Sequence, residues 1–370
     1  IRRPPRSTPK PSSAASDVYK RQVLGKGRTK CSIILKNDVQ VDLRIIDERS
    51  YGSALMYFTG SKDHNIALRK IAISKGYKLS EYGLFKGQRQ IAGRTEAEVF
   101  KKLGMDYIPP ELREHRGEIE AAQKHKLPKL IAYDAIKGDL QMHTKWSDGA
   151  HTIEEMALAA KALGYSYICI SDHYSKMRIA HGLNERQLLE QAKAIDGINK
   201  KLDGITILKG AEVDIAADGS LEAKKAVLKE LDIVIASVHA KFKQSKEEMT
   251  RRLIAAMESG CVHIIGHPTS RKINEKPPCE IDMQKLFEAS KRTKTYLEIN
   301  SLPQRLDLND VNTRAAIEAG CKLVINTDAH DREHLKFMRL GIAVARRGWA
   351  EQKHIINAQP LKKLLKALEK

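Results

Sequence analysis

Histidine and carboxylate side chains stand at the ends of successive short apolar runs, and no other feature of the sequence constrains the fold as strongly. Each run is short and apolar enough for a buried strand, so its polar residues fall where the strand ends. Imidazoles and carboxylates are ligands that Zn, Mn and Fe prefer, so the pattern predicts a metal site built from strand ends. The segments are Asp139-Leu-Gln-Met-His143, Ser171-Asp-His173, Glu212 after the run 205–210, Ser237-Val-His239, Gly266-His267 and Asp328-Ala-His330.

Strand-like and helix-like segments alternate from about Tyr133 onward, which is typical of a parallel α/β fold with about seven units. Thr152 stands three residues before Glu155 and predicts a capping box, while Gly164 and Gly260 predict helix ends. Polar residues past nearly every strand favour a (β/α) barrel over a doubly wound sheet, which binds ligands at one switch point. The expected strands are 136–143, 166–171, 205–213, 232–238, 262–267, 295–300 and 322–327, and the expected helices include 152–163, 185–202 and 246–259.

These segments resemble, in order, the motifs of the polymerase and histidinol phosphatase (PHP) domain. The resemblance spans about 230 residues. It implies a distorted (β/α)7 TIM-like barrel that holds up to three metal ions. The motifs are Gly138-Asp-Leu-Gln-Met-His143-Thr-Lys-Trp-Ser-Asp148, Ser-Asp172-His173, Gly-Ala-Glu212-Val-Asp214, Ser-Val-His239, Gly-His267-Pro and Asp328-Ala-His330.

The PHP resemblance also implies which side chains hold each ion, with manganese or zinc as the expected metal. The first ion would be held by Gln141, His143, Glu212 and Asp328. The second would be held by Glu212, His239 and His267, with Glu212 as a bridge, and the third by Asp148, His173 and His330. Many family members have a second histidine in place of Gln141, whose amide oxygen is a harder and weaker ligand, so the identity of the first ion stays open.

Two or three metal ions a few ångströms apart activate water and clamp the attacking and leaving oxygens at phosphorus, so phosphoester hydrolysis is the expected reaction. A single histidine at a strand end is more often a hydrogen-bonded core residue, and the metal interpretation depends on the whole set. The residues expected to be required for catalysis are His143, Glu212, His239 and Asp328. Basic side chains near the rim would draw in a phosphate backbone, and the candidates are Lys145, Lys241 and Arg305.

The remaining histidines are expected to lie outside the metal site. His263 alternates with His267 on one strand and is expected to be structural, while the role of His181 stays open. Surface positions are expected for His64, His115, His125, His151, His334 and His354.

The composition predicts a polyanionic partner. The 370 residues carry a formal net charge of +19, and Lys and Arg release counterions from a phosphate backbone, so DNA is the expected partner. No apolar run approaches membrane-spanning length, so no membrane association is expected. The five cysteines are odd in number and lack C-x-x-C spacing, which indicates reduced thiols in a cytoplasmic protein; we expect a monomer.

Three regions are expected along the chain. Residues 1–22 are rich in Pro, Ser and Arg without periodicity, and they resemble translated adapter sequence or a disordered segment ahead of an N-terminally truncated fragment. They carry six basic residues and one acidic residue, so the remainder keeps a net charge of +14. Residues 133–370 would form the PHP domain, and residues 23–132 an α+β region with a linker near Pro109, Pro110 and Pro128.

Residues 23–132 resemble the end of the palm and the thumb of family X DNA polymerases. The segments are Val41-Asp42-Leu-Arg44, Gly52-Ser-Ala-Leu-Met-Tyr57-Phe58-Thr59-Gly60-Ser61 and Leu79-Ser-Glu-Tyr82. With the PHP domain behind it, this is the layout of bacterial and archaeal family X polymerases. The resemblance implies that Asp42 is the third carboxylate of a magnesium-dependent palm. It also implies deoxynucleotide contacts from Tyr57, Phe58, Thr59 and Gly60, and minor-groove contacts from Asn65 and Arg69.

The expected function is a metal-dependent 3′–5′ exonuclease or 3′-end-processing phosphodiesterase of a DNA repair polymerase, acting on gapped or single-stranded DNA. A polymerase site needs an Asp-x-Asp pair upstream, and residues 23–42 offer only Asp38 and Asp42, so we expect no templated synthesis from this polypeptide, although its parent would be a gap-filling polymerase. Two alternatives stay open: a small-molecule phosphatase like histidinol phosphatase, and a DNA-binding module with structural metals. The positive charge argues against the first, and the nearly complete ligand set argues against the second.

Overall fold

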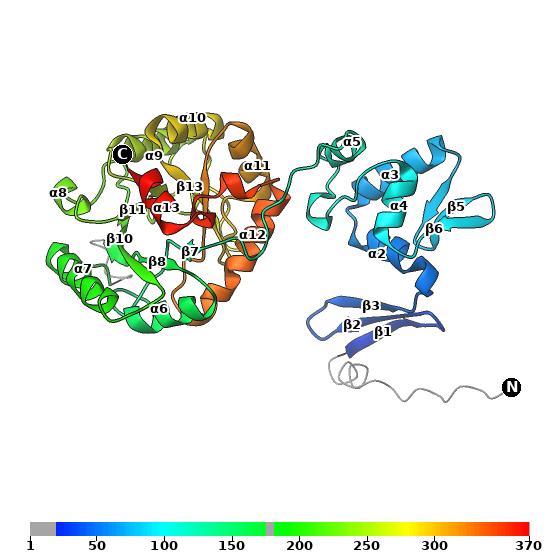
Figure 1. The fold of residues 1–370 in the computed structure, drawn as a ribbon, viewed down its shortest axis with the longest axis horizontal. Coiled ribbons are helices and arrows are strands. Elements are labelled where there is room, and N and C mark those ends of the chain that lie inside the picture. Colours follow the sequence, from blue (N-terminus) through cyan, green and yellow to red (C-terminus); the bar gives the residue numbers. More distant parts are fainter. Residues whose placement is uncertain (1–19, 175–180, 370) are drawn as a thin grey trace. The chain divides into compact units, whose positions relative to one another are not determined.

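The computed structural model describes residues 20–174 and 181–369 and divides the chain into two compact units, Ile1–Leu127 and Pro128–Lys370 (Figure 1). Residues 20–22 were expected to lie outside any folded element. That expectation is wrong, because they begin strand β1 (Lys20–Lys26), which pairs antiparallel with the next strand. The rest of the segment set aside from the sequence, residues 1–19, lies outside the described residues.

The first unit is a small α+β body with two antiparallel sheets of three strands each. In the first sheet β2 is the central strand, and in the second β5 is central. Its core includes the fully buried side chains of Leu68, Leu84, Val99 and Phe100. The elements after β1 are β2 (Lys30–Leu35), β3 (Gln40–Arg44), η1 (Glu48–Ser50), α2 (Tyr51–Thr59), α3 (Lys62–Ser74), β4 (Lys78–Ser80), β5 (Gly83–Lys86), β6 (Arg89–Ala92), α4 (Glu96–Leu103), η2 (Pro110–Leu112) and α5 (Glu118–Gln123).

Seven parallel strands of the second unit form a nearly closed barrel in chain order, with the short β9 (His173–Tyr174) paired to one of them outside this path. The barrel closes where a parallel bridge joins Met142, just past the first strand, to Ala329, just past the last. The expected distorted (β/α)7 barrel is therefore confirmed. The strands are β7 (Gly138–Asp139), β8 (Tyr167–Ile170), β10 (Thr206–Asp214), β11 (Ile233–Ser237), β12 (Ile264–Ile265), β13 (Tyr296–Asn300) and β14 (Leu323–Asn326).

Helices cover the outside of the barrel (Figure 1). The first, α6 (Ile153–Ala162), begins with the expected capping box: the Thr152 hydroxyl accepts from the Glu155 amide, and the Glu155 carboxylate accepts from the Thr152 amide. Gly164 and Gly260 adopt positive φ just past two helix ends, as expected. The other helices are α7 (Glu185–Asn199), α8 (Lys225–Leu228), α9 (Lys246–Glu258), α10 (Met283–Thr293), α11 (Asp310–Glu318), η4 (Arg332–Phe337), α12 (Met338–Arg347), η5 (Gln352–His354), η6 (Ile356–Ala358) and α13 (Leu361–Leu368).

One asparagine side chain holds the first and last strands of the barrel together. Asn357 on η6 is fully buried, and its amide donates to the carbonyls of Gly138 in β7 at 2.8 Å and Ile325 in β14 at 2.6 Å. Its side-chain oxygen accepts from the Ile325 amide at 3.1 Å. Because a buried polar group left without a partner costs free energy, these bonds tie barrel closure to the C-terminal segment.

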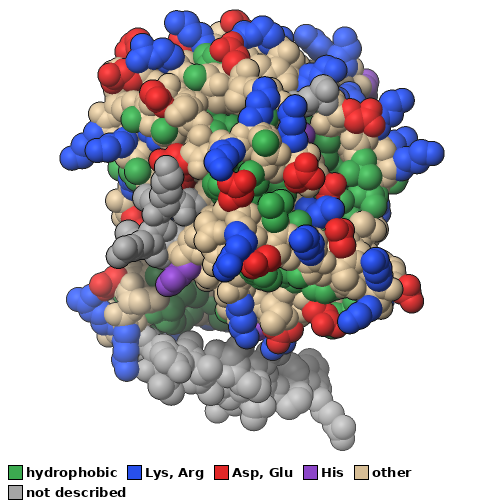
Figure 2. Space-filling model, turned by 90° about the vertical axis from the view of Figure 1, so that its left-hand side faces the viewer, with side chains coloured by type: hydrophobic (Ala, Val, Ile, Leu, Met, Phe, Trp, Pro, Cys, Tyr) green, Lys and Arg blue, Asp and Glu red, His purple; other side chains and the backbone are tan. Residues whose placement is uncertain are grey.

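One face of the molecule carries its charge in a mixed pattern. Figure 2 shows Lys and Arg side chains spread over the face in view, with acidic side chains between them rather than a single basic patch. All five cysteines are free. None of the helices in the described part of the chain is both long and apolar enough to cross a membrane.

His64 was expected at the surface, but it is fully buried in the first unit. Its Nδ1 lies 2.6 Å from Oε1 of Glu118, which is also fully buried. Glu118 accepts further hydrogen bonds from the backbone amides of His115 at 2.9 Å and Arg116 at 2.7 Å. The expectation failed because the partner of His64 lies 54 positions away in the sequence, which no local pattern reveals.

The other histidines outside the metal site lie largely where they were expected. His263 is structural, because its Nδ1 accepts a hydrogen bond from the Val234 amide at 3.0 Å. His181 is exposed. Exposed or partly exposed positions are also found for His115, His125, His151, His334 and His354.

Replacing Glu118 with Ala should loosen the first unit, because it leaves a buried imidazole and two amides without an acceptor, at a cost on the order of 3 kcal/mol. Burial opposes ionisation of Glu118, but its hydrogen bonds from His64 and from the backbone outweigh burial and lower its pKa below the ordinary 4.5. The stabilisation is therefore present at neutral pH and is lost as the pH falls below 4.5, where the unfolded carboxylate takes up a proton first.

Amide hydrogen exchange followed by mass spectrometry measures this effect locally. After correction for the intrinsic exchange rate at each pH, peptides from α3 and α5 should be less protected in the Glu118→Ala variant, and in the unmodified protein below pH 4.5. Peptides from the barrel serve as the internal control for the variant at neutral pH. Unchanged exchange in α3 would contradict the structural role given to the pair.

Candidate metal centre

The carboxyl-terminal ends of the barrel strands bring the expected ligands to one rim. Parallel strands in a closed barrel end at the same rim, so side chains that follow different strands meet there. Gln141 and His143 follow β7, His173 lies in β9, and Glu212 lies near the end of β10. The other strand-end residues are His239 after β11, His267 after β12, and Asp328 and His330 after β14.

The Glu212 carboxylate lies at the centre of this rim and is almost fully buried. Its Oε1 lies 3.1 Å from Nε2 of His267 and 3.4 Å from Nε2 of His239. Its Oε2 lies 3.2 Å from Nδ1 of His173 and 3.5 Å from Nε2 of His143. A carboxylate that faces imidazoles with both oxygens has the arrangement needed to bridge two cations.

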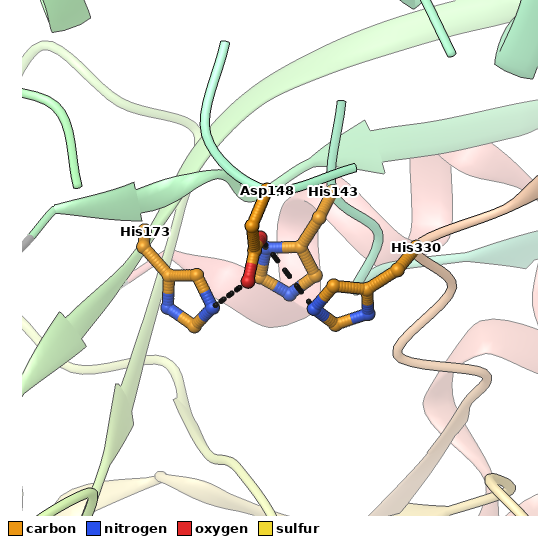
Figure 3. A group of neighbouring side chains, drawn as sticks. All are labelled: His143, Asp148, His173 and His330. Carbon is orange, nitrogen blue, oxygen red and sulfur yellow. Dashed lines mark ion pairs between the residues drawn. The ribbon is translucent and has the colours of Figure 1, made fainter. Parts of the chain in front are cut away.

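Asp148 joins three of the imidazoles at the outer edge of the rim (Figure 3). It comes from the segment between β7 and α6, and its carboxylate lies between the rings of His173 and His330, 3.6 Å from Nε2 of each. Nδ1 of His143 lies 4.0 Å from the same carboxylate. The ring of His143 stacks on that of His330, with centroids 4.2 Å apart. These four side chains can converge on a single ion.

Two further groups share ligands with the first. Potential ligand atoms within 4.8 Å of one another are contributed by His143, Glu212 and Asp328, and by His173, Glu212 and His239. The second of these groups contains His173 where the sequence led us to expect His267, which faces Glu212 from another side. The expected side chains are thus close together, and their division among individual ions stays a prediction.

Buried polar atoms without hydrogen-bond partners test whether a cation fits here. Both polar atoms of the Gln141 side chain are buried and unpartnered, and so are Nδ1 of His143 and Nδ1 of His267. Asp328 is also nearly buried, and its carboxylate lies 3.1 Å from Nε2 of His143 and 3.5 Å from Nε of Arg305. Buried carboxylates and amides are costly unless they are paired or bind metal, so the donor set fits divalent cations.

The imidazoles at the rim differ in their affinity for protons. Burial opposes protonation of His239, but the carboxylates of Glu212 and Asp214 outweigh burial and raise its pKa to about 10. Burial lowers the pKa of His173 and of His267 to about 4. Because a ring nitrogen must lose its proton to bind a metal, cation binding at this rim is coupled to proton release.

Buried carboxylates that the sequence analysis missed hold the ligand-bearing segments in place. Asp172 accepts from the Thr144 amide at 2.7 Å and from the Gln191 amide group at 2.6 Å, which fixes the segment after His143. Glu298 accepts from the backbone amide of His267 at 2.7 Å. Burial raises the pKa of Glu298 well above its usual range. In the sequence, the position of Asp172 directly before His173 was the one visible signal for these supporting carboxylates.

The three basic candidates lie at different depths. Arg305 is mostly buried and reaches Asp328 inside the rim. Lys145 and Lys241 are exposed, and Lys241 adopts the left-handed backbone conformation with φ of 56°. Arg305 is thus the candidate that contacts a carboxylate of the candidate metal centre.

Some of the expected nucleotide-binding residues of the first unit lie close to one another, namely Tyr57, Phe58 and Asn65. Tyr57 and Phe58, near the end of α2, are 37% and 51% exposed, which excludes an ordinary core pair. The Asn65 amide group donates to the Tyr57 carbonyl at 2.7 Å, and the Arg44 guanidinium lies 4.9 Å from the Phe58 ring centroid. Thr59 ends α2, Gly60 follows it, and Arg69 and Asp42 are exposed on α3 and β3.

Comparisons with known proteins agree with this division. Residues 139–302 match the family model of the PHP domain, and residues 54–114 match that of the DNA polymerase beta thumb. A probable phosphatase of Thermoanaerobacter sp. is 34% identical over 52% of this chain and 78% of its own length. The chain therefore belongs to the PHP family.

The chain is also a homologue of the DNA polymerase/3′-5′ exonuclease PolX of Bacillus subtilis. The two are 43% identical over 92% of this chain. It spans 60% of the length of that relative. A solved histidinol phosphate phosphatase of Lactococcus lactis is 20% identical, with coverage of 58% of this chain and 95% of its own and a TM-score of 0.42. The phosphatase relatives are more distant than PolX.

Replacing Gln141 with His should strengthen metal binding, because an imidazole nitrogen is a better zinc ligand than an amide oxygen. We expect Zn²⁺ affinity to rise by roughly tenfold, or about 1.4 kcal/mol, and Gln141→Leu to lower it. Titration of the metal-free protein in competition with a colorimetric chelator measures both. If Gln141→Leu binds Zn²⁺ as tightly as the unmodified protein, Gln141 is not a ligand.

Proposed function

We propose that the second unit is a divalent-metal phosphodiesterase that removes nucleotides from DNA 3′ ends. The observation that carries this proposal is the Glu212 carboxylate facing His143, His173, His239 and His267 at 3.1–3.5 Å. Manganese or zinc suits this mixed nitrogen and oxygen set. The name of the PolX relative, which includes a 3′-5′ exonuclease, supports the choice of substrate.

The ligand roles in this proposal are those that the PHP resemblance implies. Gln141, His143, Glu212 and Asp328 hold one ion. Glu212 and two histidines, His239 and His267, hold the second; Asp148, His173 and His330 hold the third. When bound, such ions neutralise the charge of a phosphodiester and make a nucleophile available at neutral pH.

The chain's own residues position the substrate in this scheme. The Arg305 guanidinium, beside Asp328, takes a non-bridging phosphate oxygen of the scissile group. Lys145 and Lys241, both exposed, attract the phosphates that follow along the strand. Glu212 and Asp328 stay ionised because hydrogen bonds and charges of neighbouring imidazoles lower their pKa despite burial. The buried side chains of Asp172 and Glu298 hold the segments that carry His143 and His267 in place when DNA binds.

The first unit would hold DNA and a deoxynucleotide in the manner of a polymerase thumb, within a cytoplasmic, monomeric DNA repair protein. The exposed rings of Tyr57 and Phe58 suit stacking against a sugar or base. Asn65 and Arg69 lie one turn apart on α3 and face the minor groove in this scheme. Asp42 serves a magnesium-dependent polymerase site in this scheme.

A small-molecule phosphatase is the second candidate, favoured by the 34% identity to a probable phosphatase. The same metal centre would serve both reactions, so the ligands do not separate the two. The net charge of +14 that remains outside residues 1–22 favours a polyanion. A module in which the metals are only structural is the third candidate, and it predicts DNA binding without hydrolysis.

Glu212→Gln should lower nucleotide release from a 3′-labelled single strand by roughly 1,000-fold or more in the presence of Mn²⁺, equivalent to about 4 kcal/mol in the barrier. The amide keeps the shape of the side chain but removes the charge that both neighbouring ions need. Glu333→Gln, which changes an exposed carboxylate paired with Lys336, is the matched control and should leave the rate unchanged. A Glu212→Gln variant with a near-normal rate would refute the bridging role.

Salt dependence should separate the nuclease from the small-molecule phosphatase. If three basic side chains bind phosphates of a single strand, raising salt from about 50 to 200 mM should weaken DNA binding about 20-fold. The rate at subsaturating DNA should fall by the same factor, whereas hydrolysis of a small phosphoester should barely change. Equal salt responses for the two substrates would favour the phosphatase.

A further inference from the structure

Asp214 lies two residues beyond Glu212 on β10, so both carboxylates project from the same face of the strand into the rim. The His239 ring lies between them. Its Nδ1 is 2.5 Å from Oδ1 of Asp214, and its Nε2 is 3.4 Å from Oε1 of Glu212. Asp214 is 7% exposed, so little water competes for this contact.

We propose that Asp214 is a positioning residue that selects the metal-binding nitrogen of His239 and holds its ring in place. This inference depends on the proposed function for the role of His239 as a ligand. Asp214 belongs to none of the three ligand groups, and its part is to act through the imidazole.

The chemistry of imidazole explains how a carboxylate makes this selection. A neutral ring has one N–H donor and one lone pair, and an ionised carboxylate only accepts hydrogen bonds. Asp214 therefore stabilises the tautomer with the proton on Nδ1, which leaves the lone pair of His239 on Nε2, the nitrogen that faces Glu212. The negative charge of Asp214 also makes Nε2 a stronger base and a stronger ligand.

The scaffold fixes the two segments that carry this pair. Asp214 pairs in register with Ser237 of β11, two residues before His239. The buried guanidinium of Arg252 donates to the carbonyls of Ile215 and, at 3.0 Å, Ala240, which directly follow Asp214 and His239. A single side chain thus ties both segments together. The pairing of Asp214 with His239 is consequently a feature of the folded barrel and not of one flexible rotamer.

Other rim imidazoles lack such a partner. Among the ligand histidines that the structure describes, Nδ1 of His143 and Nδ1 of His267 have no hydrogen-bond partner, and Nδ1 of His330 lies 2.8 Å from a backbone carbonyl. His173 directs Nδ1 at the ligand carboxylate of Glu212 itself. Among these histidines, His239 is the ligand candidate that contacts a carboxylate outside the ligand groups. Loss of Asp214 should therefore lower the affinity for one ion and leave the affinity for the others unchanged.

The test is a Zn²⁺ titration of the metal-free full chain in competition with a colorimetric chelator. Asp214→Leu, which removes both the acceptor and the charge, should weaken one Zn²⁺ site by 10- to 100-fold and leave the others unchanged. Asp214→Asn keeps an acceptor oxygen and should fall between Leu and the unmodified protein. Asp218→Asn is the matched control, because Asp218 is an exposed carboxylate that bonds to Ser220 in the turn after β10.

Thermal unfolding of the metal-free variants separates positioning from a merely structural role. A positioning role predicts similar unfolding temperatures without metal and a smaller rise on addition of Zn²⁺ for Asp214→Asn. Zn²⁺ binding by Asp214→Leu and Asp214→Asn equal to that of the unmodified protein would overturn the inference while leaving the proposed nuclease intact. Equal weakening of all sites, together with a lower unfolding temperature in both variants, would overturn it as well.

The proposed function fails separately. If the unmodified protein binds Zn²⁺ and the Asp214 variants weaken one site, but no nuclease activity accompanies binding, the inference about His239 stands and the proposed reaction is wrong.

Discussion

The junction between the first and last barrel strands, where Met142 just past β7 bridges to Ala329 just past β14, is the constraint on which the rest of the second unit depends. It brings His143 to within 3.1 Å of Asp328, a residue 185 positions later in the chain. Asp139 strengthens the same seam by accepting from the backbone amide of Thr327 at 3.2 Å. The Asn357 side chain also joins the two strands, because it donates to the carbonyls of Gly138 and Ile325. Without this closure the ligands from the two ends of the domain would lie on separate edges of an open sheet.

Closure also places several carboxylates in an apolar interior, where an isolated charge would be unstable. Glu212 tolerates burial because imidazoles surround it. Glu298 accepts hydrogen bonds from the His267 amide and, at 2.8 Å, from the Asn326 amide group, and burial raises its pKa, which favours its neutral form. The same polar contacts therefore hold the strands together and orient the candidate metal-binding atoms. A substitution among them is expected to affect stability and metal affinity together, which is why metal-free stability has to be measured beside every activity.

Much of the barrel could be predicted from the sequence, because buried strands are short apolar runs and the polar residues that matter lie at their ends. The capping box at Thr152 was visible for the same reason, since its partner is three residues away. Long-range partners were not visible: nothing near His64 predicts its contact with Glu118, and nothing near Asn357 predicts its place between two strands. The residue pattern alone also could not predict how the ligands divide among the ions, because the division depends on which oxygen of Glu212 each imidazole approaches.

The distance along the chain between the two sides of the seam has a consequence for synthesis of the protein. Asn357 bonds to a residue 219 positions earlier, so a ribosome releases Glu212 and most of the barrel well before the residues that complete the rim. Contacts of such long range form late and slowly. A nascent or prematurely ended chain would expose the unpaired edge of β7 and have no complete hydrolytic centre. The complete set of candidate ligands would thus come together only in molecules whose translation and folding are finished.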